Sequence, residues 1–199
     1  METILKSGYE KILNLFYLDK RAKIHLRDIA RKTRLNENSA TRFLKKLEKE
    51  NILISEKDGN LKKYRIQKNT SLYLIFTLFD SMHYNLLPNK RKSAISYFFK
   101  ELKDKPLIMV LFGSTAKGTF AQNSDIDILL IVNNKIHAGG AENYTESQTG
   151  IKINCLQVNI FDFINELKIK SDKVIQSALN SGYPIFNHLY FYEVFLNEN

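Results

Sequence analysis

The first third of the chain repeats its apolar residues at the spacing of amphipathic helices. Apolar side chains recur every three or four positions over residues 3–18, 26–33 and 37–50, which predicts three helices. Asn36 stands directly before the third segment, where its side chain suits a helix N-cap. The residues expected on the buried side of the third helix are Ala40, Phe43, Leu44 and Leu47.

A change of period follows these helices. Residues 52–57 and 61–66 are short segments rich in residues that favour strands, and Asp58-Gly59 between them is a strong turn signal. The sequence therefore predicts a β-hairpin, with several lysines, directly after the third helix.

The segment of residues 70–104 contains no glycine and predicts two further helices. Apolar residues occur on most sides of the first, over 72–86, and Pro88 separates it from the second, over 89–103. A helix that is apolar on several sides needs a partner surface, which can be the other domain or a second chain. Homodimerisation through residues 70–104 is therefore one hypothesis.

The last part of the chain alternates between strand and helix signals. Continuous apolar runs over 107–112 and 126–132 predict buried strands, and a third strand is expected over 151–158. Glycine-containing residues 134–150 are expected to form a loop. The tail is expected to contain two helices over 160–181, a turn at residues 181–184 and a further apolar, aromatic segment.

The net charge of +9 is confined to one part of the chain. Residues 1–69 hold 18 Lys and Arg against nine Asp and Glu, whereas residues 70–199 hold 12 of each. Such asymmetry indicates two units, of which the first meets a polyanion. An alternative is that the lysine-rich helices are merely well solvated.

Composition narrows the class of protein further. The single cysteine, Cys155, excludes an internal disulfide and favours a reducing, cytoplasmic environment. No apolar run reaches the roughly 18 residues that a membrane span needs, so no membrane partner is expected. The first residues also lack the layout of a signal peptide.

Three helices followed by a basic hairpin resemble the winged helix-turn-helix family. The resemblance covers residues 1–69, and it implies that the third helix enters the major groove of duplex DNA while the hairpin contacts the backbone. By position, the residues expected to face DNA are Asn38, Ser39, Thr41, Arg42, Lys45, Lys46, Lys57, Lys62 and Lys63. The alternative is a module that binds a protein partner.

The sharpest motif lies between two of the predicted strands. Gly113-Ser114 ends the first strand, and ten residues later Asp125 and Asp127 open the next. Residues i and i+2 of a strand point to the same side, so the two carboxylates are expected to project together and to repel each other unless a cation lies between them. Oxygen ligands favour Mg²⁺ or Mn²⁺ over zinc. Glycine lets a phosphate approach the backbone, and Lys117 adds a positive charge.

This arrangement resembles the DNA polymerase β-like nucleotidyltransferase superfamily, most closely its small "minimal" branch. The residues that carry the resemblance are Gly113-Ser114-Thr115-Ala116-Lys117-Gly118 and Ser124-Asp125-Ile126-Asp127. It implies a short mixed sheet flanked by helices, and transfer of a nucleotidyl group from an NTP, with ATP the expected nucleotide, by means of two divalent cations. Asp125 and Asp127 would be catalytic and would hold the metals, and Gly113, Ser114 and Lys117 would bind the nucleotide phosphates.

One position departs from the family's pattern. The family usually places a third carboxylate on a later strand, where it binds the catalytic metal and helps to deprotonate the acceptor. Here that position is Asn154, whose carbonyl can ligate a metal but which cannot act as a base. The nearest acids, Glu142, Glu146 and Asp162, are expected in loops or at a helix start.

The sequence thus predicts an α+β chain: a winged helix-turn-helix over 1–69, connecting helices over 70–104, and a nucleotidyltransferase domain over 105–199. Three functions remain open. The chain could transfer an NMP to a protein or nucleic-acid acceptor; it could be a regulator or antitoxin-like protein whose degenerate transferase domain senses nucleotide; or its first domain could present a nucleic-acid substrate to the site.

Overall fold

The structure is a computed structural model that describes residues 8–59 and 61–198. The chain divides into two compact units, Met1–Phe79 and Asp80–Asn199, and each has its own sheet. The division falls inside helix α5 (Thr70–Asn85), the first of the two helices expected between the domains. In the described residues no helix has both the length and the apolar character needed to cross a bilayer.

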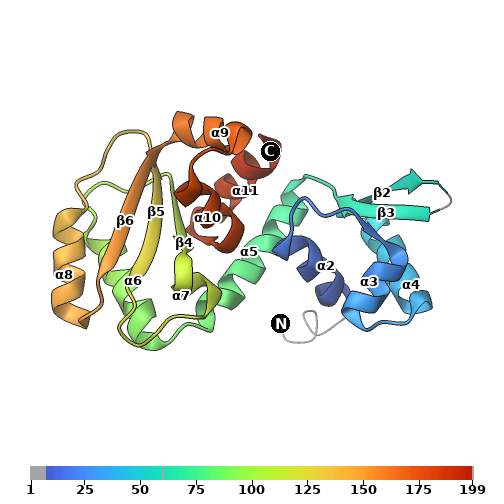
Figure 1. The fold of residues 1–199 in the computed structure, drawn as a ribbon, viewed down its shortest axis with the longest axis horizontal. Helices are drawn as coiled ribbons and strands as arrows, with labels where there is room; N and C mark the ends of the chain where they lie inside the picture. The colour runs from blue at the N-terminus through green and yellow to red at the C-terminus, as the bar shows by residue number, and fades with distance from the viewer. Residues whose placement is uncertain (1–7, 60, 199) are drawn as a thin grey trace. The chain divides into compact units, whose positions relative to one another are not determined.

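The first unit has the helices and the hairpin that the hydrophobic pattern predicts (Figure 1). Its elements before α5 are α2 (Gly8–Leu18), β1 (Ile24–His25), α3 (Leu26–Thr33), α4 (Glu37–Lys49), β2 (Leu53–Asp58) and β3 (Leu61–Ile66). The three strands form an antiparallel sheet in the order β1-β3-β2. Strand β1 was not expected from the sequence, because two residues are too short to show a period. Residues 3–7 of the first predicted helix lie outside the described residues.

Helix α4 begins where the sequence predicts. The Asn36 side chain accepts a hydrogen bond of 2.8 Å from the backbone N–H of Ser39, which satisfies one of the free donors of the first turn. Ala40, Leu44 and Leu47 are buried. Phe43 is only half-buried, and its ring packs edge-on against Tyr9 of α2 at a centroid distance of 4.5 Å. The predicted buried side of this helix is therefore confirmed at three positions and partly exposed at the fourth.

The second unit is a four-stranded mixed sheet flanked by helices, as expected (Figure 1). Its elements are α6 (Asn89–Glu101), β4 (Ile108–Phe112), α7 (Gly113–Lys117), β5 (Ile126–Val132), α8 (Gly139–Thr149), β6 (Ile153–Asn159), α9 (Ile160–Ile169), α10 (Lys173–Ser181), β7 (Tyr183–Phe186) and α11 (His188–Asn197). The strand order is β6-β5-β4-β7, in which only the β5–β6 pair is parallel.

The two faces of this sheet have different partners. Alternate residues of β5, from Ile126 to Val132, join a core cluster that includes Ala94, Ile95 and Phe98 of α6 and Ala141 of α8. Figure 1 shows α6 and α8 on this side of the sheet and α9, α10 and α11 on the other. Because side chains alternate along a strand, Asp127 lies on the face opposite to α6 and α8.

Two expectations for this unit were wrong. Residues 134–150 are not simply a loop, because α8 forms there, buries Ala141 and Thr145, and ends at Gly150 with a positive φ of 64°. The glycines at its start mask a helix that tertiary packing stabilises. Residues 183 and 184 are not in a turn but begin strand β7, which lies at the edge of the sheet, where a proline is tolerated.

A buried carboxylate ties the ends of the second unit together. Asp80 of α5 is fully buried and accepts hydrogen bonds from Tyr192 Oη at 2.8 Å and from the His188 ring at 3.0 Å. Both partners belong to α11. The aromatic segment at the end of the chain is therefore part of the packing of this unit. Dimer formation through residues 70–104 stays a prediction.

Candidate active site

Asp125 and Asp127 project to the same side, as the strand period predicts. Asp125 directly precedes β5 and Asp127 is its second residue, and both are half-buried. The side-chain nitrogen of Asn154 lies 3.2 Å from Asp125 Oδ2 and 3.2 Å from Asp127 Oδ1. One atom thus bridges the two carboxylates.

The register of the parallel strand pair explains this convergence. Asp127 on β5 is paired with Asn154 on β6, and the next residue pair is Ile128 with Cys155. Neighbouring side chains in register point to the same face of a sheet. Asn154 therefore occupies the position where the resemblance noted in the sequence implies a third carboxylate.

Gly113 completes this edge of the sheet from the strand on the other side. Phe112, the last residue of β4, is paired with Asp127, and Gly113 follows it with a φ of 69°. A Cβ at residue 113 would collide with Asp127 Oδ2. Glycine is needed here for two reasons, a left-handed backbone and the close approach of a carboxylate.

The other two residues expected to bind nucleotide lie on the short helix α7. Ser114 is half-buried and follows Gly113 directly in the chain. Lys117, the last residue of α7, is exposed. No ion pair joins Lys117 to either aspartate among the residues that the structure describes. The structure thus brings together Gly113, Asp125 and Asp127, with Ser114 next to Gly113 in the chain, while Lys117 is exposed on the same helix.

The sequence did not predict the role of Arg91, which holds the segments around the site in place through hydrogen bonds. This arginine is 3% exposed, although it lies in the basic run Asn89-Lys90-Arg91-Lys92. It donates to Thr115 Oγ1 at 2.7 Å, to the Ser124 carbonyl at 2.8 Å and to the Ala121 carbonyl at 3.2 Å. Burial lowers the pKa of Arg91, and the nearby charge of Asp125 opposes that shift. Arg91 thereby joins α6 to α7 and to the loop that carries Asp125.

A signal for Arg91 was present in the sequence. It stands three, four and seven positions before Ala94, Ile95 and Phe98, which are the buried residues of α6. An arginine on the apolar side of a helix is expected to have buried partners, because a buried charge must be paired or hydrogen-bonded.

Glu142 does not replace the missing acid. Its Oε1 accepts a hydrogen bond of 3.2 Å from the backbone N–H of Cys155, on the face of the sheet opposite to Asn154. Burial, with a smaller contribution from the Glu142 charge, raises the pKa of Cys155 to about 12. This thiol is therefore protonated at neutral pH, which makes it a poor nucleophile. Asp162 lies in the first turn of α9.

Comparison with known proteins assigns a family to this part of the chain. Residues 93–188 match the family of polymerase beta nucleotidyltransferases. The matched region is just under half of the chain and contains Gly113, Asp125, Asp127 and Asn154. The match agrees with the resemblance that the motif of Gly113, Asp125 and Asp127 indicates for this region.

No protein of curated function matches the chain. One solved structure, described as "Crystal structure of the toxin-antitoxin with AMP-PNP", is similar with a TM-score of 0.39 and 19% identity. The similarity covers 56% of this chain and 84% of the other.

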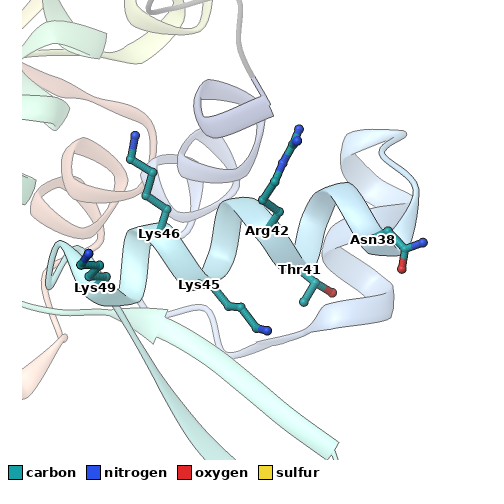
Figure 2. Close-up of a pocket in the computed structure, with 6 residues that line it drawn as sticks. All are labelled: Asn38, Thr41, Arg42, Lys45, Lys46 and Lys49. Carbon is teal, nitrogen blue, oxygen red and sulfur yellow. The ribbon is translucent and has the colours of Figure 1, made fainter.

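Most of the α4 residues that are expected to contact DNA line one hollow. Asn38, Thr41, Arg42, Lys45, Lys46 and Lys49 line a shallow hollow of about 480 Å³ (Figure 2). Figure 2 shows Arg42 and Lys46 extending from one side of the helix and Lys45 from the other. Ser39 is not among the lining residues, and its N–H is used by the helix cap. Lys49, which was not among the residues expected to contact DNA, extends the basic surface by one more turn.

Aromatic rings support two of these cations. The guanidinium carbon of Arg42 lies 5.3 Å from the ring centre of Phe43, and Lys46 Nζ lies 5.5 Å from that of Tyr9. Such contacts hold long side chains in place while they leave the charge accessible.

The lysines of the hairpin differ in their partners. Lys63 forms an ion pair of 2.5 Å with Asp58, on the face where Glu56 pairs with Arg65 at 2.5 Å. Lys57 and Lys62 are opposite each other in the ladder and point to the other face. Neither has an ion pair within residues 8–59 and 61–198. Of the predicted phosphate contacts, Lys57 and Lys62 are therefore the available cations of the hairpin.

Proposed function

We propose that the second unit is a nucleotidyltransferase that moves an NMP from an NTP, with ATP as the expected nucleotide, to a hydroxyl of a protein or nucleic acid. The observation that supports it most directly is the convergence of Gly113, Asp125 and Asp127 at neighbouring strand ends, inside the region that matches the family. The glycine leaves space for phosphate, and the carboxylates supply charge for a cation.

The reaction is a substitution at phosphorus. The acceptor oxygen bonds to the α-phosphorus, the bond between that phosphorus and the oxygen bridging to the β-phosphorus breaks, and pyrophosphate leaves. The backbone at Gly113 and Ser114, with Lys117, would bind the outer phosphates and orient the α-phosphorus. Asp125 and Asp127 are the carboxylates at this edge of the sheet, and one of them would accept the proton of the hydroxyl.

The donor set fits a divalent cation. A single position, now filled by Asn154 Nδ2, lies 3.2 Å from an oxygen of each aspartate. Oxygen donors of this kind suit Mg²⁺ or Mn²⁺. No group of three His, Cys, Asp or Glu that could hold a metal is found in the described residues, so the third protein donor would be the Asn154 carbonyl. A bound cation would polarise the phosphate and neutralise charge on the leaving pyrophosphate.

The test is transfer of label from each NTP, labelled at the α-phosphate, to components of a cell extract with Mg²⁺ or Mn²⁺. We expect labelling by the wild type and none by Asp127→Asn, which keeps the size of the side chain. Asp162→Asn is the matched control, because Asp162 lies on α9, beyond the end of β6 opposite to Asn154. Equal labelling by wild type and Asp127→Asn would disprove the transferase.

For the first unit we propose a winged helix-turn-helix that binds duplex DNA, with α4 in the major groove and the hairpin against the backbone. The proposal is supported by the basic hollow on α4 and by the charge of residues 1–69. In this proposal Asn38, Thr41, Arg42 and Lys45 would face bases, and Lys46, Lys57 and Lys62 would face phosphates.

The test for DNA binding is the affinity for duplexes across a range of salt. Binding through phosphates weakens steeply as salt rises, because counterions are released from DNA. A flat salt response would disprove contact through the basic surface. Tighter binding to single strands or to structured RNA than to duplex would favour presentation of a nucleic-acid substrate.

A second function is favoured by one observation, the amide of Asn154 at the position expected for an acid. In this case the second unit binds a nucleotide without turning it over, and the chain is a nucleotide-sensing regulator, with an antitoxin-like protein included in that class. Duplex binding would then shift when an NTP is added, and Asp127→Asn would still bind duplex in the absence of NTP. A protein that transfers label as described above contradicts this alternative.

A further inference from the structure

The amide of Asn154 is positioned to do more than fill a space between two carboxylates. We infer that Asn154 limits this site to one divalent cation, and that its side chain exchanges a donor for an acceptor when that cation binds. The inference rests on the proposed binding of NTP and cation, and it concerns how many cations the chain itself can hold.

The orientation of the amide follows from its neighbours. The oxygens of Asp125 and Asp127 are acceptors, and an NH₂ group has two hydrogens, one for each carboxylate. The carbonyl oxygen turned toward them would add a third electronegative atom. The contacts of 3.2 Å to both aspartates therefore identify the NH₂ group as the side facing the carboxylates.

In this orientation the amide does part of what a cation does. The NH₂ group of Asn154 carries partial positive charge, and by donating to both carboxylates it holds them together. The same oxygens are those that would bind the cation, so the N–H groups and the cation compete for them. Rotation of the amide about its last bond exchanges Nδ2 for Oδ1 and turns the competitor into a neutral ligand, without a change in the backbone.

The charge of the site then decides the number of cations. Asp125, Asp127 and Asn154 supply a formal charge of −2, where three acids would supply −3. A second divalent cation would have to bind beside the first with no additional carboxylate from the protein. Repulsion between two cations so close is large unless anionic ligands lie between them. The loss of one carboxylate therefore weakens the second position much more than the first.

No other acid compensates for this loss in the part of the chain that the structure describes. Glu142 is engaged with the backbone of Cys155 on the opposite face of the sheet, and Asp162 lies beyond the far end of β6. The remaining β6 residues, from Ile153 to Asn159, include no acid. Asn154 is thus the residue that sets the number of divalent cations bound at this site.

The experiment counts Mn²⁺ bound to the full chain, by titration followed by electron paramagnetic resonance, in the presence of an ATP analogue with a methylene bridge between the α- and β-phosphates. The count is corrected for Mn²⁺ bound to the analogue alone. We expect one protein-dependent Mn²⁺ for the wild type and two for Asn154→Asp.

A matched control is available on the same strand. Asn159→Asp makes the same chemical change and adds the same charge, but at the other end of β6. There Asn159 caps α9 through an oxygen that aspartate keeps, and only its donation to the Asn133 carbonyl is lost. We expect one Mn²⁺ for this variant. Two for Asn159→Asp would mean that net charge, and not the place of the carboxylate, sets the number, and would overturn the inference.

The remaining outcomes separate the inference from the proposed function. Two Mn²⁺ bound to the wild type overturn the inference and leave the transferase untouched, and this result does not depend on how well Asn154→Asp folds. One Mn²⁺ in both wild type and a folded Asn154→Asp also overturns it. No Mn²⁺ in either protein overturns the inference together with cation-dependent transfer. One Mn²⁺ in a wild type that transfers no label supports the inference while the transferase fails.

Discussion

Arg91 Nη1 donates a hydrogen bond of 2.7 Å to Thr115 Oγ1, and this contact joins helix α6 to the short helix α7, which begins at Gly113. The other guanidinium nitrogen, Nη2, reaches the carbonyls of Ala121 and Ser124, just before Asp125. The ring of Phe120 lies 4.0 Å from the guanidinium carbon. The buried side chain of Arg91 therefore holds two segments in place: α7, which carries the expected nucleotide ligands, and the loop before Asp125, which leads to the expected metal ligands.

Replacing this arginine should destabilise the second unit. Arg91→Met keeps much of the apolar length but leaves buried acceptors without a donor, and each such group costs about 1–3 kcal/mol. Since three acceptors lose their donor, we expect a loss of free energy of unfolding of at least that size, measured by urea denaturation. Lys90→Met, an exposed lysine on the same turn, is the control and should change little. Equal stability of Arg91→Met and wild type would show that the carbonyls find other donors.

Gly113 and Gly118 form a matched pair with nearly the same backbone. Their φ angles are 69° and 70°, so alanine at either position meets the penalty of a left-handed conformation, about 1–2 kcal/mol. Only at residue 113 would the new Cβ also collide with Asp127, whereas at residue 118 no atom lies within 4 Å of it. Gly113→Ala should therefore cost more stability and displace the carboxylate.

The readout for this pair is the rise in melting temperature when NTP and Mg²⁺ are added, since a ligand that binds only the folded state stabilises it. We expect the rise to persist in Gly118→Ala and to disappear in Gly113→Ala. If the melting temperature rises by the same amount in both variants, the close contact between residue 113 and the Asp127 carboxylate has no part in ligand binding.

The features that the sequence predicted are those determined by local rules. The Asn36 cap, the hairpin at Asp58-Gly59 and the shared side of Asp125 and Asp127 depend on neighbours in the chain, and the structure confirms each. The position of Asn154 beside Asp127 required only a count along a strand. The binding roles of these residues stay predictions.

The features that were missed depend on distant partners. Helix α8 has few apolar residues, and it is stabilised by packing of Ala141 and Thr145 that no local period shows. Strand β7 gains its hydrogen bonds from β4, about 70 residues earlier in the chain. The partners of Arg91 lie 24 to 34 residues away, so a basic run in the sequence concealed a buried cation.

The ion pairs of the hairpin predict a specific loss of stability in acid. Hydrogen bonds from Arg65 and Lys23 hold the pKa of Glu56 below its ordinary value of 4.5. The ionised form is therefore favoured by the folded state, and its contribution is present above pH 4.5 and is lost as the pH falls through the lowered pKa.

Thermal unfolding of Glu56→Gln and wild type, from neutral pH to well below pH 4.5, tests this prediction. We expect the wild type to be more stable at neutral pH and the difference to shrink in acid. Since the pairs are exposed, added salt should reduce the difference as well. Glu48→Gln serves as the control. Parallel curves for Glu56→Gln and wild type would contradict the role of these ion pairs.

Lys62 and Lys63 provide the final prediction, because they are adjacent and differ in their partners. Lys63 is paired with Asp58, whereas Lys62 is opposite Lys57 and points to the other face of the hairpin. Removing either lysine changes the net charge by the same amount. A phosphate contact, however, requires a cation that is not already neutralised by a carboxylate.

We therefore expect Lys62→Ala to weaken binding to mixed-sequence duplex DNA more than Lys63→Ala does. The slope of log affinity against log salt should fall in magnitude by about one for Lys62→Ala and by less for Lys63→Ala. Fluorescence anisotropy at several salt concentrations measures both slopes. Equal slopes for the two variants would mean that only net charge matters, and a larger effect of Lys63→Ala would place the other face of the hairpin against the DNA.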